Sequence, residues 1–182
     1  MVGKDSIATV AVTMNDASLN NVIVRGGSIN TFGQFTGGIV SKLFGTSELN
    51  DVAFHGNINS TYTGTIGDGF LGGIAQHTTG NTAIHGAVFT GVIITTTNNK
   101  IGGLVGDHGG SLENCAADVA ITTPGNRVGG LVALSATVSL PAFSRLEFAH
   151  RWPRWAVVWR AEHQHRDCQK ICFDDHQQRE SE

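Results

Sequence analysis

The sequence predicts an all-β protein built as a parallel β-solenoid, in which Gly-rich repeats of about 27–35 residues stack as successive coils. Three observations support this class. Gly accounts for 24 of the 182 residues while charged residues make up only 15%. Pairs of adjacent glycines recur every 27–35 residues. A short segment in which apolar and polar residues alternate, called the alternating phrase below, recurs with them. Glycine suits tight turns and β-branched residues suit a pleated surface, so we expect helix to be the minority state.

The glycine pairs mark the repeat. They begin at positions 37, 72, 102 and 129, which gives spacings of 35, 30 and 27 residues. Each pair is followed by two apolar residues, as in Gly102-Gly103-Leu104-Val105. We expect one glycine of each pair to take a bend that no Cβ would allow, and the other to let adjacent coils approach closely.

The alternating phrases begin at positions 19, 49, 84 and 112, with spacings of 30, 35 and 28 residues. Apolar side chains of one parity face the same side of such a segment, as a half-buried strand requires. Alignment of the phrases predicts three stacks of equivalent inward residues. These are Val52, Ala87 and Cys115; Phe54, Phe89 and Ala117; and Ile58, Ile93 and Ile121.

Stacking follows from the small apolar face of one repeat. Burying one Val, Ile or Phe contributes roughly 1.5–3 kcal/mol, whereas ordering the backbone costs about 1–2 kcal/mol per residue. A single repeat therefore stays unfolded until neighbouring coils cover it. The variation in repeat length lies in the polar segments 60–69 and 95–100, which we expect to be loops. Because a solenoid has open edges, we also expect end-to-end self-association.

The periodic pattern ends near residue 133, so we divide the chain into a repeat domain, 1–133, and an atypical tail, 134–182. All 24 Gly lie at or before position 130, whereas all three Trp and six of the eight Arg lie after position 135. Two hypotheses are open for the tail. It is either a segment read in a shifted frame, and so not native, or a short helical cap anchored by Trp152, Trp155 and Trp159. We expect it to be helical or disordered.

Charge and cysteine content exclude several classes. A net charge of -3, with no concentrated basic face in the first 135 residues, gives no reason to expect a nucleic acid or an anionic membrane as partner. Three cysteines, at 115, 168 and 172, make no disulfide framework. No stretch approaches ~18 consecutive apolar residues and the first 14 residues hold no apolar signal region, so we expect no membrane span and no export signal in this chain.

Two motifs suggest nucleotide or calcium binding and are weak. Residues Gly67 to Gly72 fit the G-x-G-x-x-G pattern, but the residues after them do not open a helix that could hold a pyrophosphate. We predict a loop that runs into the next glycine pair. Asp107 and Asp118 could contribute to a calcium site between coils, but the Gly-Asp nonapeptide of calcium-binding β-rolls is absent.

The remaining reactive side chains also favour structural roles. Cys115 occupies the position of Val52 and Ala87, so we expect a small buried residue. His55 and His85 sit beside turns with no carboxylate at matching offsets, and we expect solvated strand histidines. The tail holds ligand types for zinc, but their spacing matches no standard finger; these residues are His163, His165, Cys168, Cys172 and His176. We therefore predict no catalytic, cofactor-binding or metal-binding residues and no cofactor.

The third repeat carries a family resemblance. Gly102-Gly103-Leu104-Val105-Gly106, followed by Ser111-Leu112-Glu113-Asn114-Cys115, resembles the GLUG repeat, a Gly-Gly-Leu-Val-Gly phrase followed by Gly or Ser, an apolar residue and Asn-Cys or Asn-Val. The copies at Gly37 and Gly129 are similar, and the resemblance covers about residues 15–133. The copy at Gly72 departs most, with Gly86-Ala87 where Asn and its neighbour are usual.

The resemblance implies a repeat module of a large bacterial surface or secreted protein. Such repeats occur in adhesin-like proteins and in the non-catalytic regions of immunoglobulin A-cleaving zinc metallopeptidases. We therefore expect a stalk or adhesin-like surface, not an enzyme, which contacts a host protein or glycan outside the cell as part of a longer protein. The alternative is the non-catalytic repeat region of a secreted zinc metallopeptidase, whose His-Glu-x-x-His helix this sequence lacks.

Overall fold

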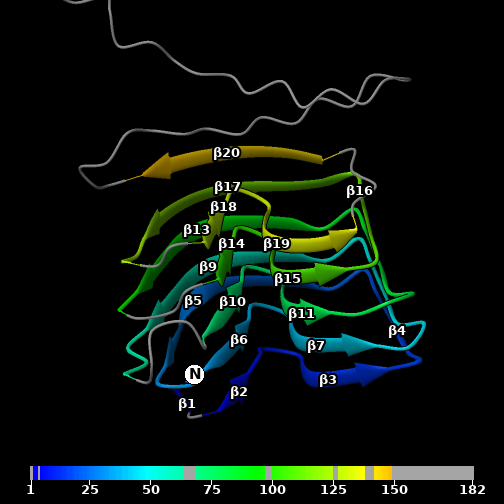
Figure 1. Ribbon diagram of the computed structural model, residues 1–182, viewed down its shortest axis with the longest axis horizontal. Coiled ribbons are helices and arrows are strands. Elements are labelled where there is room, and N and C mark those ends of the chain that lie inside the picture. The colour runs from blue at the N-terminus through cyan, green and yellow to red at the C-terminus, as the bar shows by residue number, and fades with distance from the viewer. Residues whose placement is uncertain are drawn as a thin grey trace, which may run out of the picture.

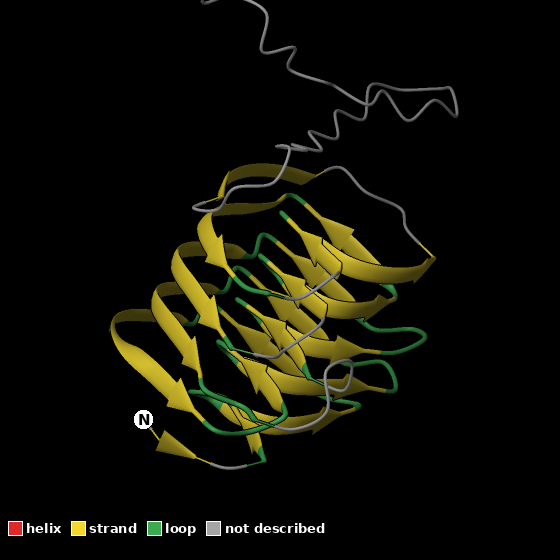
Figure 2. Ribbon diagram, turned by 60° about the vertical axis from the view of Figure 1, so that its left-hand side comes forward, coloured by secondary structure: helices red, strands yellow, loops and turns green. Residues whose placement is uncertain are grey.

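The computed structural model describes residues 2–3, 5–63, 69–96, 100–124, 127–137 and 142–148, of which 2–3, 134–137 and 142–148 are described by their backbone alone. Within these residues every regular element is a strand, and every strand pair is parallel. The strands stack as the coils of a solenoid (Figures 1 and 2). The predicted all-β parallel β-solenoid is confirmed. No helix capable of crossing a membrane occurs among the described residues.

Four parallel sheets run along the solenoid, and each of the first four coils contributes one strand to each of them. Sheet A contains β1 (Val2–Gly3), β5 (Ile23–Thr31), β9 (Ala53–Ser60), β13 (Val88–Thr95), β17 (Cys115–Thr122) and β20 (Ala142–Phe148). Sheet B contains β2 (Ser6–Ile7), β6 (Phe35–Gly37), β10 (Phe70–Gly72), β14 (Lys100–Gly102) and β18 (Arg127–Gly129). Sheet C contains β3 (Ala11–Asn15), β7 (Val40–Phe44), β11 (Ala75–Thr78), β15 (Val105–Gly109) and β19 (Val132–Thr137). Sheet D contains β4 (Ser18–Asn20), β8 (Glu48–Asn50), β12 (Ala83–His85) and β16 (Ser111–Glu113).

The connections between sheets differ in how much their length varies. Two residues join sheet B to sheet C at each of the four glycine-pair bends, and three residues join β2 to β3. The connection from sheet A to sheet B has nine residues between β9 and β10 but four between β13 and β14. The two segments predicted to hold the variation in repeat length, 60–69 and 95–100, span these connections.

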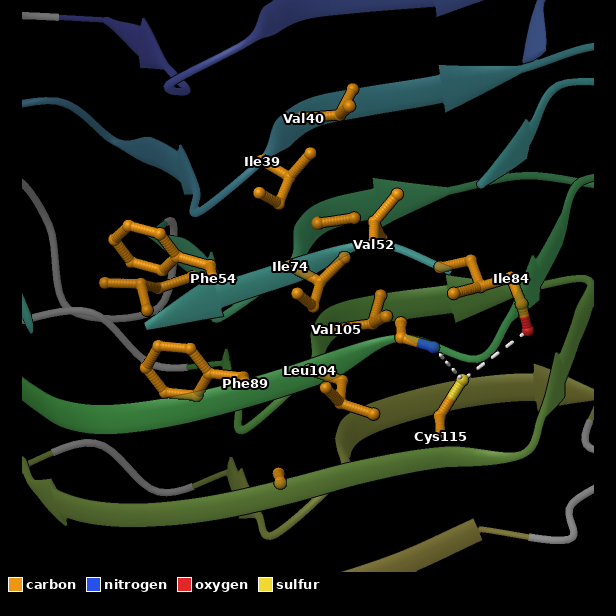
Figure 3. Packing of buried hydrophobic residues seen from close by; sticks show 14 of the residues in the cluster. Ile39, Val40, Val52, Phe54, Ile74, Ile84, Phe89, Leu104, Val105 and Cys115 are labelled. Atoms are coloured by element: carbon orange, nitrogen blue, oxygen red, sulfur yellow. Dashed lines mark hydrogen bonds between the residues drawn. The ribbon is translucent and has the colours of Figure 1, made fainter. Parts of the chain in front are cut away.

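The interior is a continuous apolar core formed by the predicted stacks. The register pairs Phe89 with Phe54 and Ala117, and Ile93 with Ile58 and Ile121. The rings of Phe54 and Phe89 lie one above the other in the core (Figure 3), and their centroids are 5.8 Å apart. All of these residues are buried. The three predicted stacks are therefore confirmed, because the same register also aligns the third set, Val52, Ala87 and Cys115.

The glycine pairs form the bend between sheets B and C for reasons of space. A Cβ on Gly72 would lie 1.9 Å from the carbonyl oxygen of Ala75, within the same bend. A Cβ on Gly73 would lie 2.1 Å from the carbonyl oxygen of Gly103, in the next coil. The first glycine thus permits the bend and the second permits close stacking, as predicted. Neither has a positive φ, so only the absent side chain is required here.

The bend between sheets D and A uses backbone conformation instead. Asn21, Asp51, Gly86 and Asn114 all have φ between 52° and 65°. Asn, Asp and Gly are the residues that adopt this left-handed conformation most readily. Gly86 therefore replaces an asparagine without changing the backbone, and β12 pairs in register with both of its neighbours. The repeat that departs most from the motif is an ordinary coil.

Strand pairing continues past residue 133. The backbone of β19 pairs with β15, and β20 pairs with β17 over seven residues, Cys115 with Ala142 through Ile121 with Phe148. The boundary predicted at residue 133 therefore does not coincide with the end of the pairing. The tryptophans at 152, 155 and 159 lie outside the described residues, and both hypotheses for the tail stay predictions.

Candidate functional site

The two sequence patterns considered for nucleotide and zinc binding lie partly or wholly outside the described residues. Gly67 and Asp68 of the G-x-G-x-x-G pattern are among these, and Phe70–Gly72 forms strand β10 rather than the predicted loop. It leads into the glycine bend instead of a helix. The five His and Cys residues of the tail lie outside the described part as well. No group of three or more His, Cys, Asp or Glu side chains that could hold a metal occurs in the described ranges.

Cys115 is buried in the core, as predicted from its place in the repeat. Its Sγ accepts a hydrogen bond from the Ala87 N–H at 3.4 Å and lies 3.6 Å from the Ile84 carbonyl oxygen, to which it can donate (Figure 3). The thiol also lies 3.1 Å from a second acceptor, the Glu113 carbonyl oxygen. Burial raises the pKa of the thiol to about 11. The thiol is thus protonated at neutral pH and fills the space of a small apolar residue.

The two strand histidines have partners that their local sequence does not reveal. His85 Nδ1 lies 3.4 Å from Glu113 Oε2 in the next coil, so the expectation of no matching carboxylate was wrong for this residue. His55 Nδ1 contacts Thr90 Oγ1, also one coil away. Stacking brings together residues about 30 positions apart, whereas offsets within one strand cannot show such pairs. Both histidines still lie partly exposed on strands.

Outward side chains of sheets B and C meet beside the glycine bend. We call this set the B/C corner, and it consists of Phe35, Lys42, Phe70, His77, Lys100, Asp107 and Arg127. In sheet B the register aligns Phe35, Phe70, Lys100 and Arg127 in one row. In sheet C it aligns Lys42, His77 and Asp107 in a second row. The two rows run side by side along the solenoid, separated by the two-residue bend.

Aromatic rings and ammonium groups form a continuous stack at the B/C corner. The rings of Phe35 and Phe70 are 5.7 Å apart with an interplanar angle of 18°. Lys42 Nζ lies 4.6 Å from the centroid of Phe35, and Lys100 Nζ lies 4.1 Å from that of Phe70. A cation over a ring face at such distances contributes about 0.5–1 kcal/mol at an exposed site and more when desolvated. The lysines are therefore held in defined positions.

The second row links these cations to a carboxylate. Lys100 Nζ lies 3.3 Å from Asp107 Oδ2, with side chains only 13% and 22% exposed. His77 Nδ1 lies 3.9 Å from the same oxygen. Burial lowers the pKa of His77, Asp107 opposes that shift, and the nearby Lys42 and Lys100 lower the pKa further. At neutral pH His77 is thus an uncharged hydrogen-bonding group between two cations.

Unpaired polar atoms lie next to the B/C corner. Ser41 and Gln76 precede Lys42 and His77, and both are buried. Neither Ser41 Oγ nor Gln76 Oε1 has a hydrogen-bond partner. The equivalent residue in the next coil is Gly106, where a Cβ would lie 2.8 Å from the carbonyl oxygen of Leu71 in sheet B. This position of sheet C therefore packs against the main chain of sheet B, at the base of the corner.

Charge is unevenly distributed around the solenoid. Four Lys or Arg side chains are described, and three of them, Lys42, Lys100 and Arg127, belong to the B/C corner. Four of the seven described carboxylate side chains lie in sheet D or beside it: Asp16, Glu48, Asp51 and Glu113. Only Asp107 belongs to the corner. Within the described residues the B/C corner is thus a locally cationic strip, although the net charge of the chain is -3.

No protein-family model, curated protein or solved structure matches this chain. The resemblance to the GLUG repeat consequently depends on the quoted motifs alone.

Of the B/C corner residues only Asp107 was singled out from the sequence, for a calcium site with Asp118, which lies on β17 of sheet A instead. A signal for the other members was present. Each sheet B member stands two positions before a glycine pair, as Lys100 does before Gly102. Each sheet C member stands five positions after the start of a pair, as Asp107 does after Gly102. Comparing these offsets across repeats identifies both rows. Their contact across the bend needed the structure.

Proposed function

We propose that this chain is a structural and binding repeat module, a rod of stacked coils that displays rows of side chains to a ligand. One observation carries the proposal: the register is kept from coil to coil, so outward residues of different repeats form straight rows. Asparagines illustrate this, since Asn50 Nδ2 donates to Asn20 Oδ1 at 2.9 Å and Asn59 Nδ2 donates to Asn30 Oδ1 at 3.0 Å.

Such rows suit recognition because their side chains are fixed by a rigid scaffold. Stacked repeats create extended lateral surfaces, and pre-ordered side chains lose less conformational entropy when a ligand binds. The proposal assigns no reaction to the chain. Its placement in a bacterial surface or secreted protein, as a stalk or adhesin-like region that contacts a host protein or glycan, is supported by the resemblance to GLUG repeats.

Binding of the full 182-residue chain to an array of glycans and extracellular matrix proteins tests this function. The expected result is saturable binding to at least one class, which disappears when the chain is thermally unfolded. The unfolded chain is the control for non-specific adhesion. Equal retention of folded and unfolded chain by every spot would contradict the proposal.

A further inference from the structure

The B/C corner carries the features of a ligand site, and three of its properties limit the ligand. The first is its charge. The corner holds three cations, Lys42, Lys100 and Arg127, and one carboxylate, that of Asp107, which pairs with Lys100; His77 adds no charge at neutral pH. Arg127 is exposed and Lys42 is partly exposed, so both are open to a ligand. The corner therefore favours an anion.

The second property is the spacing of the cations along the solenoid. Neighbouring coils lie ~4.8 Å apart, so Lys42 and Arg127, three coils apart, are separated by about 14 Å along the axis. One compact anion cannot reach both. A linear polymer that follows the axis meets cations at intervals of one to two coils. The rows thus fit an extended chain with widely spaced charges.

The third property is what lies between the cations. Asp107 accepts hydrogen bonds and repels an adjacent anion, and the edges of Phe35 and Phe70 offer apolar contact. Along a nucleic acid duplex each strand presents one phosphate per ~3.4 Å of helix axis, a charge density that would place negative charge against Asp107. A polysaccharide whose carboxylates alternate with uncharged, hydroxyl-bearing sugars avoids this conflict. Its hydroxyls can donate to Asp107 and its C–H groups can contact the rings.

We propose that the B/C corner binds a linear, uronate-containing polysaccharide that lies along the solenoid axis, with carboxylates at Lys42 and Arg127 and sugar hydroxyls at His77 and Asp107. This inference rests on the proposed binding function and names its face and its ligand class. The pre-ordered lysines, one held over each ring, reduce the conformational entropy lost on binding.

Calorimetric titration of the full chain with hyaluronate tests the assignment, with dextran as the uncharged control. The double variant Lys42→Gln and Arg127→Gln should bind hyaluronate at least tenfold more weakly. Arg25→Gln is the matched control, because it removes the described cation that lies on sheet A, away from the corner. It should change affinity less than twofold. Unchanged melting temperatures in both variants establish that each is folded.

A measurement on the unmodified chain keeps the test independent of any variant. Hyaluronate should shift the imidazole NMR resonances of His77 more than those of His55, which belongs to sheet A. A larger shift at His55 would overturn the assignment. So would equal losses in the corner variant and Arg25→Gln, or binding that follows charge density alone, with heparin and poly-dT preferred over hyaluronate.

Failure of this assignment is distinguishable from failure of the proposed function. If the folded chain binds a neutral glycan or a protein on the array and the corner variant binds it equally well, the binding module stands and the corner assignment falls. If the folded chain retains nothing that the unfolded chain does not, both fall. Doubling of the mass without any polysaccharide, lost in the corner variant, would instead show that the corner binds a second copy.

Discussion

Two pairs of phenylalanines stack in this molecule with almost the same geometry and in different surroundings. Phe54 and Phe89 lie in the interior with centroids 5.8 Å apart and an interplanar angle of 14°. Phe35 and Phe70 lie at the B/C corner with centroids 5.7 Å apart and an angle of 18°. The interior pair is fully buried, whereas the corner pair is partly exposed beneath two lysines. In both pairs the repeat brings equivalent rings of neighbouring coils together. The inward pair stabilises the core, whereas the outward pair positions two lysines at the surface.

Removing one ring from each pair should change the stability of the protein by different amounts. We expect Phe89→Ala to lower the free energy of unfolding by about 3–5 kcal/mol, because it leaves a cavity in the core. The matched variant Phe70→Ala should cost only about 1 kcal/mol, since its ring is partly solvated. Urea denaturation followed by circular dichroism measures both. Equal destabilisation would mean that the corner pair is part of the core.

The glycine bend beside the corner pair should be nearly as sensitive. In Gly73→Ala the new Cβ would lie 2.1 Å from the Gly103 carbonyl oxygen and 2.4 Å from Cγ of Phe89. We expect a loss of about 3 kcal/mol through overpacking. Gly80→Ala is the control, because Gly80 has φ +54° but nothing within 4 Å of an added Cβ. It should cost about 1 kcal/mol, through backbone strain alone. If Gly80→Ala destabilised the chain more, conformation rather than space would govern the glycines.

Mild acid should lower the stability of the folded chain by the smallest amount. It acts through one histidine at the surface and one in the interior. Burial lowers the pKa of His77 at the corner and of His108, whose Nδ1 lies 2.7 Å from Thr78 Oγ1 in the interior. A folded pKa below the unfolded value of 6.5 means that the unfolded chain binds more protons below that pH. Stability should therefore be complete above pH 6.5 and decline as the pH falls toward the folded pKa values.

Melting temperatures measured between pH 7.5 and pH 5 test this direction. The variant His108→Gln should flatten the decline, because it removes the more deeply buried of the two imidazoles. An unchanged slope in that variant would assign the pH dependence to other groups.

The fold could be predicted from the sequence because every repeat carries the residues that determine its bend and its inward face. The glycine pairs locate the bend between sheets B and C, and the phrases locate the inward residues, so the stack of Ile58, Ile93 and Ile121 follows from alignment alone. The outward face was harder to predict. Lys100 and Asp107 belong to different sheets, and only the angle of the bend brings their side chains to 3.3 Å.

Side-chain contacts between neighbouring coils were also difficult to predict, because the repeat length varies. His85 and Glu113 are 28 positions apart, whereas the equivalent step from Asn50 to His85 is 35 positions. No fixed offset in the sequence identifies both pairs. A partner in the next coil becomes visible only when the phrases are aligned first and the outward positions are compared afterwards.

The connections between sheets A and B differ in length from coil to coil, so we expect this part of the solenoid to accept inserted residues. Nine residues join β9 to β10 and four join β13 to β14, yet both strand pairs keep their register. Length varies most at this edge, and loop-closure entropy grows only slowly with length. We expect a peptide or small domain inserted between Thr95 and Lys100 to leave the strand register unchanged. This connection is therefore a suitable position for displaying a foreign sequence on the solenoid.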